Sequence, residues 1–196
     1  NSDVEAEYNR NLFFYNELKF EVADPTVIYI SDTNSTEYGY FYAYGTSDQI
    51  GCTGFQAWRS KDMVNWEDMG PVYLPDFNNN WAYTNYWAPE IIYDETGMNI
   101  QGETYNYFMF YNAERYDENE DFVGANRTTY QYLSVLYAKE PNGPFIHPDG
   151  FKNSNGQDLS VTKPVFDFSF GNSLVNADFQ CLNTIDASPF VDDNGI

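Results

Sequence analysis

The sequence predicts an all-β protein, and three observations support this prediction. Aromatic residues are abundant, because 18 Tyr, 16 Phe and 4 Trp make up 19% of the 196 residues. Such side chains favour the half-buried surface of a pleated sheet. Short runs of alternating apolar and polar residues recur along the chain, separated by turn-forming residues. Several of these runs also begin in the same way, which indicates that the strands belong to a repeat.

The repeated start consists of a small or acidic residue, a proline and a short apolar run. It occurs at 23–29, 87–93 and 187–191. Proline is tolerated at the first residue of a strand, where no hydrogen-bond donor to the neighbouring strand is needed. Self-similarity at a period of tens of residues predicts a repeat architecture.

The first repeat unit contains four predicted strands. The proline-led strand at 23–29 is followed by a polar turn at 31–37 and an aromatic strand at 38–45. A third strand at 54–60 and a fourth at 66–73 complete the unit.

The second unit repeats this order. Its proline-led strand at 87–93 precedes a predicted turn at 94–103 and an aromatic strand at 104–112. A third strand follows at 130–138, and a weaker fourth begins at 144–145. Four antiparallel strands per unit are typical of β-propeller blades. A β-sandwich would also give short strands, but it would not give the recurring proline-led start.

A third unit begins near the end of the sequence. We therefore expect residues 1–196 to belong to a single propeller domain, with blade 1 at about 20–75, blade 2 at about 87–150 and the start of blade 3 at about 185–196. Two blades and one strand do not close a ring. We expect a companion chain or the remaining polypeptide to complete the propeller.

The charge balance argues against two classes of partner. Only 9 Lys and Arg stand against 30 Asp and Glu, which gives a formal net charge of -21. A chain this acidic repels phosphate backbones and anionic lipid headgroups, so we expect neither nucleic-acid nor membrane binding. A neutral ligand such as a carbohydrate is not repelled.

The blade geometry predicts where a site would lie. The first strand of each blade lines the central channel, and the segments leading into the first strands share one face. This places Asp24, residues 81–87 and Asp186 on one rim. Two separated carboxylates near aromatic side chains suit acid/base cleavage of a glycosidic bond. The aromatic residues predicted to contact a sugar are Trp81, Tyr86 and Trp87.

Four segments together resemble glycoside hydrolase family 43. They occur in the order of that family and are Asp24-Pro25 with the following apolar strand, residues 59–66 (RSKDMVNW), residues 87–90 (WAPE) and residues 185–190 (IDASPF). The resemblance implies a five-bladed β-propeller that hydrolyses arabinose- or xylose-containing plant glycans with inversion of configuration.

The resemblance also implies roles for individual residues. Asp24 resembles the general base that activates water. Asp186 resembles the second acid, which orients the general acid and raises its pKa through the proximity of like charges. The family's general-acid Glu lies on a later blade, so we expect it beyond residue 196; Glu90 and Glu114 do not fit its motif.

We therefore predict an exo-acting α-L-arabinofuranosidase, with a β-D-xylosidase of the same family or a non-catalytic carbohydrate-binding propeller as alternatives. The long loop between Glu114 and Thr129 would narrow the pocket and favour single terminal sugars. The expected substrate is a plant polysaccharide or oligosaccharide. We expect a secreted or cell-surface protein rather than a cytoplasmic one.

No cofactor is expected for catalysis, and no metal ligands are predicted. The only histidine, His147, lies in a predicted surface turn with no partner His or Cys. A structural calcium ion is compatible with the sequence, but its ligands cannot be identified in this chain.

Overall fold

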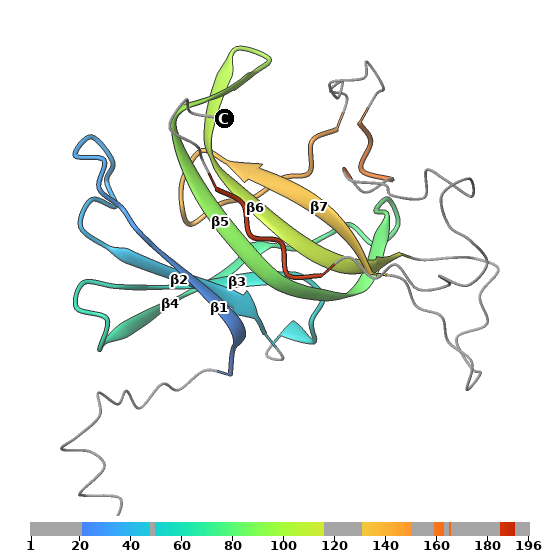
Figure 1. Cartoon of the computed structure of the whole chain (residues 1–196), viewed down its shortest axis with the longest axis horizontal. Coiled ribbons are helices and arrows are strands. Elements are labelled where there is room, and N and C mark those ends of the chain that lie inside the picture. Colours follow the sequence, from blue (N-terminus) through green and yellow to red (C-terminus); the bar gives the residue numbers. More distant parts are fainter. Residues whose placement is uncertain are drawn as a thin grey trace, which may run out of the picture.

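The computed structural model confirms the all-β prediction. Two antiparallel sheets are formed, and no α-helix occurs among the described residues (Figure 1). No helix in that part of the chain is long and apolar enough to cross a membrane. The structure describes residues 21–47, 50–115, 131–149, 159–162, 165 and 185–190.

The first sheet contains the four strands predicted for blade 1. They are β1 (Ala23–Tyr29), β2 (Phe41–Thr46), β3 (Phe55–Ser60) and β4 (Trp66–Tyr73). Each strand pairs antiparallel with the next, so their order in the sheet is their order in the sequence. This simple meander is the arrangement expected of a propeller blade.

The second sheet contains β5 (Ala82–Ile100), β6 (Glu103–Arg115) and β7 (Gln131–Ala138), again in sequence order. The weak fourth strand of blade 2 is reduced to one antiparallel bridge between Tyr137 and Ile146, in which each backbone N–H donates to the other's carbonyl over 3.0 Å. Blade 2 therefore follows the same plan as blade 1.

The predicted turn at 94–103 is wrong. Strand β5 continues to Ile100, and the hairpin closes through the two-residue turn Gln101–Gly102. Both turn residues have positive φ, 53° and 87°, which suits the tight hairpin turns that match strand twist. The polar residues 94–97 lie instead where the pairing of β5 with β6 shifts register.

An aromatic core joins the two sheets, in which β1 and β2 contact β5. The rings of Tyr86 and Tyr111 stack with centroids 5.7 Å apart, and Phe55 of blade 1 meets Tyr111 edge-on at 5.4 Å. Tyr44 of β2 donates its hydroxyl hydrogen to the carbonyl of Pro141 at 2.5 Å. The two blades are therefore tied by both apolar packing and a buried hydrogen bond.

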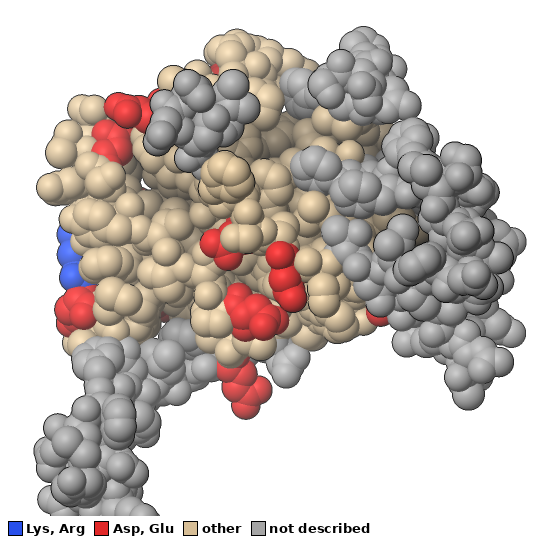
Figure 2. All heavy atoms as spheres, viewed as in Figure 1, with Lys and Arg blue, Asp and Glu red and all other residues tan. Residues whose placement is uncertain are grey.

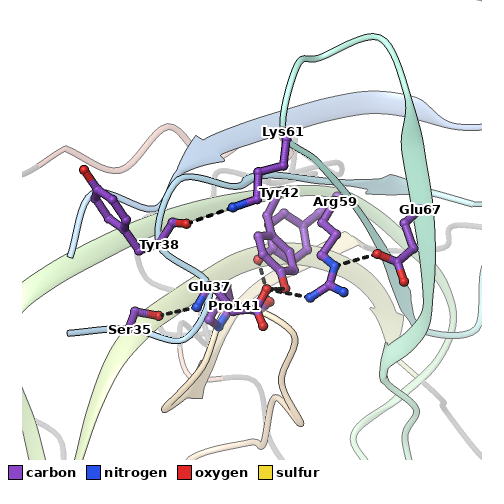
Figure 3. Close-up of polar contacts among 9 residues, drawn as sticks. Ser35, Glu37, Tyr38, Tyr42, Arg59, Lys61, Glu67 and Pro141 are labelled. Atoms are coloured by element: carbon purple, nitrogen blue, oxygen red, sulfur yellow. Dashed lines mark hydrogen bonds and ion pairs between the residues drawn. The ribbon is translucent and has the colours of Figure 1, made fainter. Parts of the chain in front are cut away.

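The outer part of blade 1 is held by a charged network (Figure 3). The guanidinium of Arg59 on β3 contacts Glu37 and Glu67, each at 2.8 Å. Tyr42 of β2 donates its hydroxyl to the same carboxylate of Glu37 at 2.6 Å. These contacts raise the pKa of Arg59, and they fix the turn before β2 against β3 and β4.

The start of blade 3 is described only in part. Residues 185–190 carry no assigned strand, and residues 191–196 lie outside the described residues, so the predicted first strand of this blade remains a prediction. The segment nevertheless lies against blade 2, because the backbone N–H of Asp186 donates to Oδ1 of Asn112 at 3.0 Å.

The structure corrects the position of His147. The side chain is buried, with 8% of the residue exposed, and does not lie in a surface turn. Its Nε2 lies 3.3 Å from the hydroxyl of Ser134 on β7. Burial lowers the pKa of His147 to about 4, so the imidazole is neutral at physiological pH.

Candidate active site

Asp24 lies at the start of β1, directly before Pro25. Its side chain is exposed, and its backbone has a positive φ of 48°. The conformation is uncommon for a residue other than glycine, and such backbones concentrate at functional sites. The hydroxyl of Thr46, at the end of β2, donates to Oδ2 of Asp24 at 3.3 Å. One carboxylate oxygen therefore has a protein partner.

Thr46 also connects Asp24 to blade 2. The backbone N–H of Ala88 on β5 donates to the Thr46 hydroxyl oxygen at 2.9 Å. Ala88 follows Trp87, whose side chain is 37% exposed. The start of β1 and the exposed indole of Trp87 are thereby held on the same edge of the two sheets.

Asp186 lies further along this edge. Its backbone N–H is bound by Asn112, and Asn112 is the residue of β6 that pairs with Trp87 of β5. The backbone of Asp186 also has a positive φ, 58°, and its side chain is exposed. The two predicted catalytic residues are therefore linked through Thr46, the backbone of β5 at positions 87 and 88, and Asn112, which binds the backbone of Asp186.

We call this edge the rim; it consists of Asp24, Thr46, Trp87, Ala88, Asn112 and Asp186. In Figure 1 the segment at 185–190 runs along β5 and β6, close to where β1 lies beside β5. Acidic side chains gather over this region in Figure 2, whereas Lys and Arg appear at one edge of that face. Among the residues described, the rim thus offers carboxylates and an aromatic ring to a ligand, while the Lys and Arg visible on this face lie at its edge.

The structure does not bring the other two predicted aromatic residues to the surface. Tyr86 and Trp81 are 0% and 2% exposed and pack in the aromatic core between the blades. The hydroxyl of Tyr86 donates to the carbonyl of Ala82 at 3.1 Å, and burial raises its pKa far above the ordinary value. Both rings therefore lie in the core beneath the surface, where they support the rim.

The two glutamates set aside in the sequence have other positions. Glu90 accepts a hydrogen bond from the hydroxyl of Thr26 at 3.1 Å, which links the inner strands β5 and β1. Glu114 is buried on β6 and is paired in register with Gln131 of β7. Glu90 therefore helps to hold the two blades together, whereas Glu114 lies inside the sheet of blade 2.

Thr46 and Asn112 are rim residues that the sequence did not indicate. Both have the same kind of strand partner. Thr46 pairs with Ala23, two residues before Pro25, and Asn112 pairs with Trp87, two residues before Pro89. A search for a polar residue at or directly after the end of each predicted aromatic strand, 38–45 and 104–112, would have found both.

Within the described ranges, no group of three or more His, Cys, Asp or Glu side chains is placed to hold a metal ion. The loop expected to narrow the pocket, between Glu114 and Thr129, lies outside the described residues from position 116 onward.

Two meander sheets, side by side with their first strands adjacent and a carboxylate-bearing rim at one edge, define a protein of the β-propeller class. The family model for glycosyl hydrolases family 43 matches residues 18–196, and the chain belongs to this family. The expected membership is therefore confirmed, and the two sheets correspond to propeller blades.

Solved structures show the same fold. A thermostable family-43 glycoside hydrolase matches with a TM-score of 0.55 and 22% identity, over 92% of this chain and 40% of its own. An endo-1,4-beta-xylanase from Bacteroides thetaiotaomicron gives 0.51 and 22%, over 90% and 40%. An alpha-L-arabinofuranosidase from Clostridium thermocellum gives 0.50 and 17%, over 92% and 47%. The chain thus spans less than half the length of these enzymes.

Proposed function

We propose that this chain is part of an inverting, exo-acting glycosidase that removes α-L-arabinofuranose from plant glycans. The observation that carries the proposal is a series of contacts that links Asp24 to Asp186. Asp24 is hydrogen-bonded to Thr46, and Thr46 to the backbone of β5 next to Trp87. Trp87 pairs with Asn112 of β6, and Asn112 is hydrogen-bonded to the backbone of Asp186. Family membership supports the reaction class, and this connection supports a site in which both predicted acidic residues lie near the exposed Trp87.

In the proposed reaction, the carboxylate of Asp24 accepts a proton from a water molecule. The water oxygen bonds to the anomeric carbon as the bond to the leaving oxygen breaks on the opposite face, which inverts the configuration. A general acid from outside residues 1–196 gives its proton to the leaving oxygen. The carboxylate of Asp186 orients that acid and keeps it protonated through the repulsion of like charges.

Trp87 is the residue we propose as the sugar contact. Trp87 is 37% exposed at the rim, whereas the neighbouring Tyr86 is buried. An indole face packs against the apolar face of a sugar ring, and its N–H is available to a hydroxyl group. This would position the sugar above the carboxylates.

The remaining parts of the proposal follow from the substrate. The steps above use carboxylates and water and call for no cofactor. A plant polysaccharide meets an enzyme outside the cell, so we place the protein in the secreted or cell-surface compartment. The rest of the propeller is to be supplied by further polypeptide, in cis or from a companion chain.

The test compares the full-length enzyme with its Asp24→Asn variant on 4-nitrophenyl α-L-arabinofuranoside and 4-nitrophenyl β-D-xyloside. We expect release of arabinose, with kcat reduced by about 10²- to 10⁴-fold in the variant, as for loss of a general base. NMR of the first product formed should show the inverted anomer.

A matched variant is Asp32→Asn, because Asp32 lies in the turn between β1 and β2 and its carboxylate accepts only a local backbone N–H, that of Asn34, among the contacts described. It should retain parental activity. Wild-type turnover in Asp24→Asn would overturn the assignment of the base, and preference for the xyloside would make the enzyme a β-D-xylosidase. Binding of both sugars without hydrolysis would identify a carbohydrate-binding propeller.

A further inference from the structure

We infer that Thr46 is a positioning residue for the general base, which it holds against blade 2. The inference rests on the proposed role of Asp24. Thr46 is buried, with 9% of the residue exposed, although it ends a strand next to an exposed carboxylate. A buried hydroxyl at such a place is stabilised by its hydrogen bonds, and the structure assigns both partners.

The direction of each hydrogen bond follows from chemistry. A backbone N–H can only donate, so the Thr46 oxygen accepts from Ala88 at 2.9 Å. A carboxylate can only accept, so the single hydroxyl hydrogen of Thr46 points to Oδ2 of Asp24 at 3.3 Å. The hydroxyl is thus used in both directions. Among the contacts of the described residues, Oδ1 of Asp24 has no protein partner, which leaves it for a water molecule.

The backbone around this contact is constrained on both sides. Asp24 and Ala88 each precede a proline and each have positive φ, 48° and 43°. They occupy the same position in blades 1 and 2. Thr46 therefore bridges the strained starts of two neighbouring inner strands, and a change in the spacing of the blades would move the carboxylate.

The second blade contains an equivalent contact. Asn112 occupies on β6 the place that Thr46 occupies on β2, because their strand partners are Trp87 and Ala23, each two positions before a proline. Its Oδ1 accepts the N–H of Asp186, another rim residue with positive φ, 58°. Twice in this chain, therefore, the side chain opposite the residue two positions before a proline accepts a backbone N–H from the next inner segment, that of Ala88 directly before Pro89 and that of Asp186 three residues before Pro189. The repetition indicates a built feature of the rim.

The test uses two variants of the full-length enzyme at position 46 and one control variant at position 96. Thr46→Val keeps the shape and removes the hydroxyl, so we expect kcat to fall by about 10- to 100-fold, as for a misplaced catalytic group, with KM within about twofold. Thr46→Ser keeps the hydroxyl and should restore kcat to within about threefold of the parent. Thr96→Val, the same change in the distant β5–β6 hairpin, should leave both constants unchanged.

A double-mutant cycle with Asp24→Asn separates positioning from general stability. If Thr46 acts through Asp24, Thr46→Val should cause little further loss in the Asp24→Asn background. An equal loss in both backgrounds, or parental kcat in Thr46→Val, would overturn the inference.

Folding failures are also decisive. If Thr46→Val does not fold, Thr46→Ala replaces it in the same cycle; failure of both variants while Thr46→Ser folds would show a purely structural hydroxyl and overturn the inference. The proposed function fails separately, when Asp24→Asn itself retains activity.

Discussion

The hydrogen bond between the blades from Tyr44 to Pro141 can be removed without changing the shape of the core. Tyr44 is 0% exposed, and its hydroxyl donates to the carbonyl of Pro141, 97 residues away in the sequence. Burial raises the pKa of the Tyr44 hydroxyl well above its ordinary value, so it remains a donor at every working pH. The substitution Tyr44→Phe deletes one oxygen atom and leaves the ring in place.

The expected cost follows from what remains after the change. The ring keeps its edge-on contact with Phe145, at 6.2 Å between centroids, so little apolar burial is lost. The buried carbonyl of Pro141 loses this donor. An acceptor left without its partner in the interior costs about 1–3 kcal/mol. We expect the free energy of unfolding to fall by about 2 kcal/mol.

Urea unfolding of the full-length enzyme, followed by tryptophan fluorescence, measures this difference. The matched control is Tyr38→Phe, in which the same oxygen is lost from a ring that is 48% exposed, and it should change stability by less than about 0.5 kcal/mol. A Tyr44→Phe variant as stable as the parent would refute the reasoning, as would an equal loss in the control.

Two further predictions concern pH and ligand binding. Burial lowers the pKa of His147 to about 4. Between pH 6.5 and 4 the unfolded chain therefore binds a proton that the folded chain does not. The free energy of unfolding should decrease by up to about 3 kcal/mol as the pH falls through this range. Unfolding titrations should show a flatter pH dependence in His147→Asn, and an unchanged slope would contradict the assignment. Trp87→Ala should raise KM for the arabinofuranoside roughly tenfold through loss of ring packing, whereas Trp66→Ala on β4, away from the rim, should not. Steady-state kinetics of both variants decides this, and an unaffected KM in Trp87→Ala would remove the indole from the sugar site.

The strands were predictable because their pattern is local. Alternation along residues 40–44 and 107–111 indicates strands without knowledge of the partner, and the structure contains β2 and β6 there. The turn at 94–103 failed for a non-local reason. Residues 94–97 have turn-forming side chains, but Asn106 on the facing strand donates its side-chain N–H groups to the carbonyls of Asp94 and Glu95, at 2.8 and 3.3 Å. This contact accommodates the bulge and lets the hairpin continue.

The aromatic residues near the rim could be predicted only as a group. Tyr86 and Trp87 are adjacent in the sequence, and adjacent residues of a strand point to opposite faces. Which residue points inward depends on register, and the pairing of β5 with β6 shifts between Thr84 and Trp87 and again between Trp87 and Glu90. The motif could therefore locate the rim but not distinguish the buried tyrosine from the exposed tryptophan.

Thr46 and Asn112 were not indicated by the sequence, but they explain how the other rim residues are held in place. Asp24, Ala88 and Asp186 all have positive φ without being glycine, a conformation that costs on the order of 1–2 kcal/mol per residue. For two of them a hydrogen bond from the preceding blade fixes the backbone N–H, through Thr46 and Asn112. Asp24 is held instead through its side chain. The strained backbones and the hydrogen bonds that stabilise them thus occur together at the edge that carries both predicted acids. This is expected where the position of a carboxylate matters more than the stability of the local backbone.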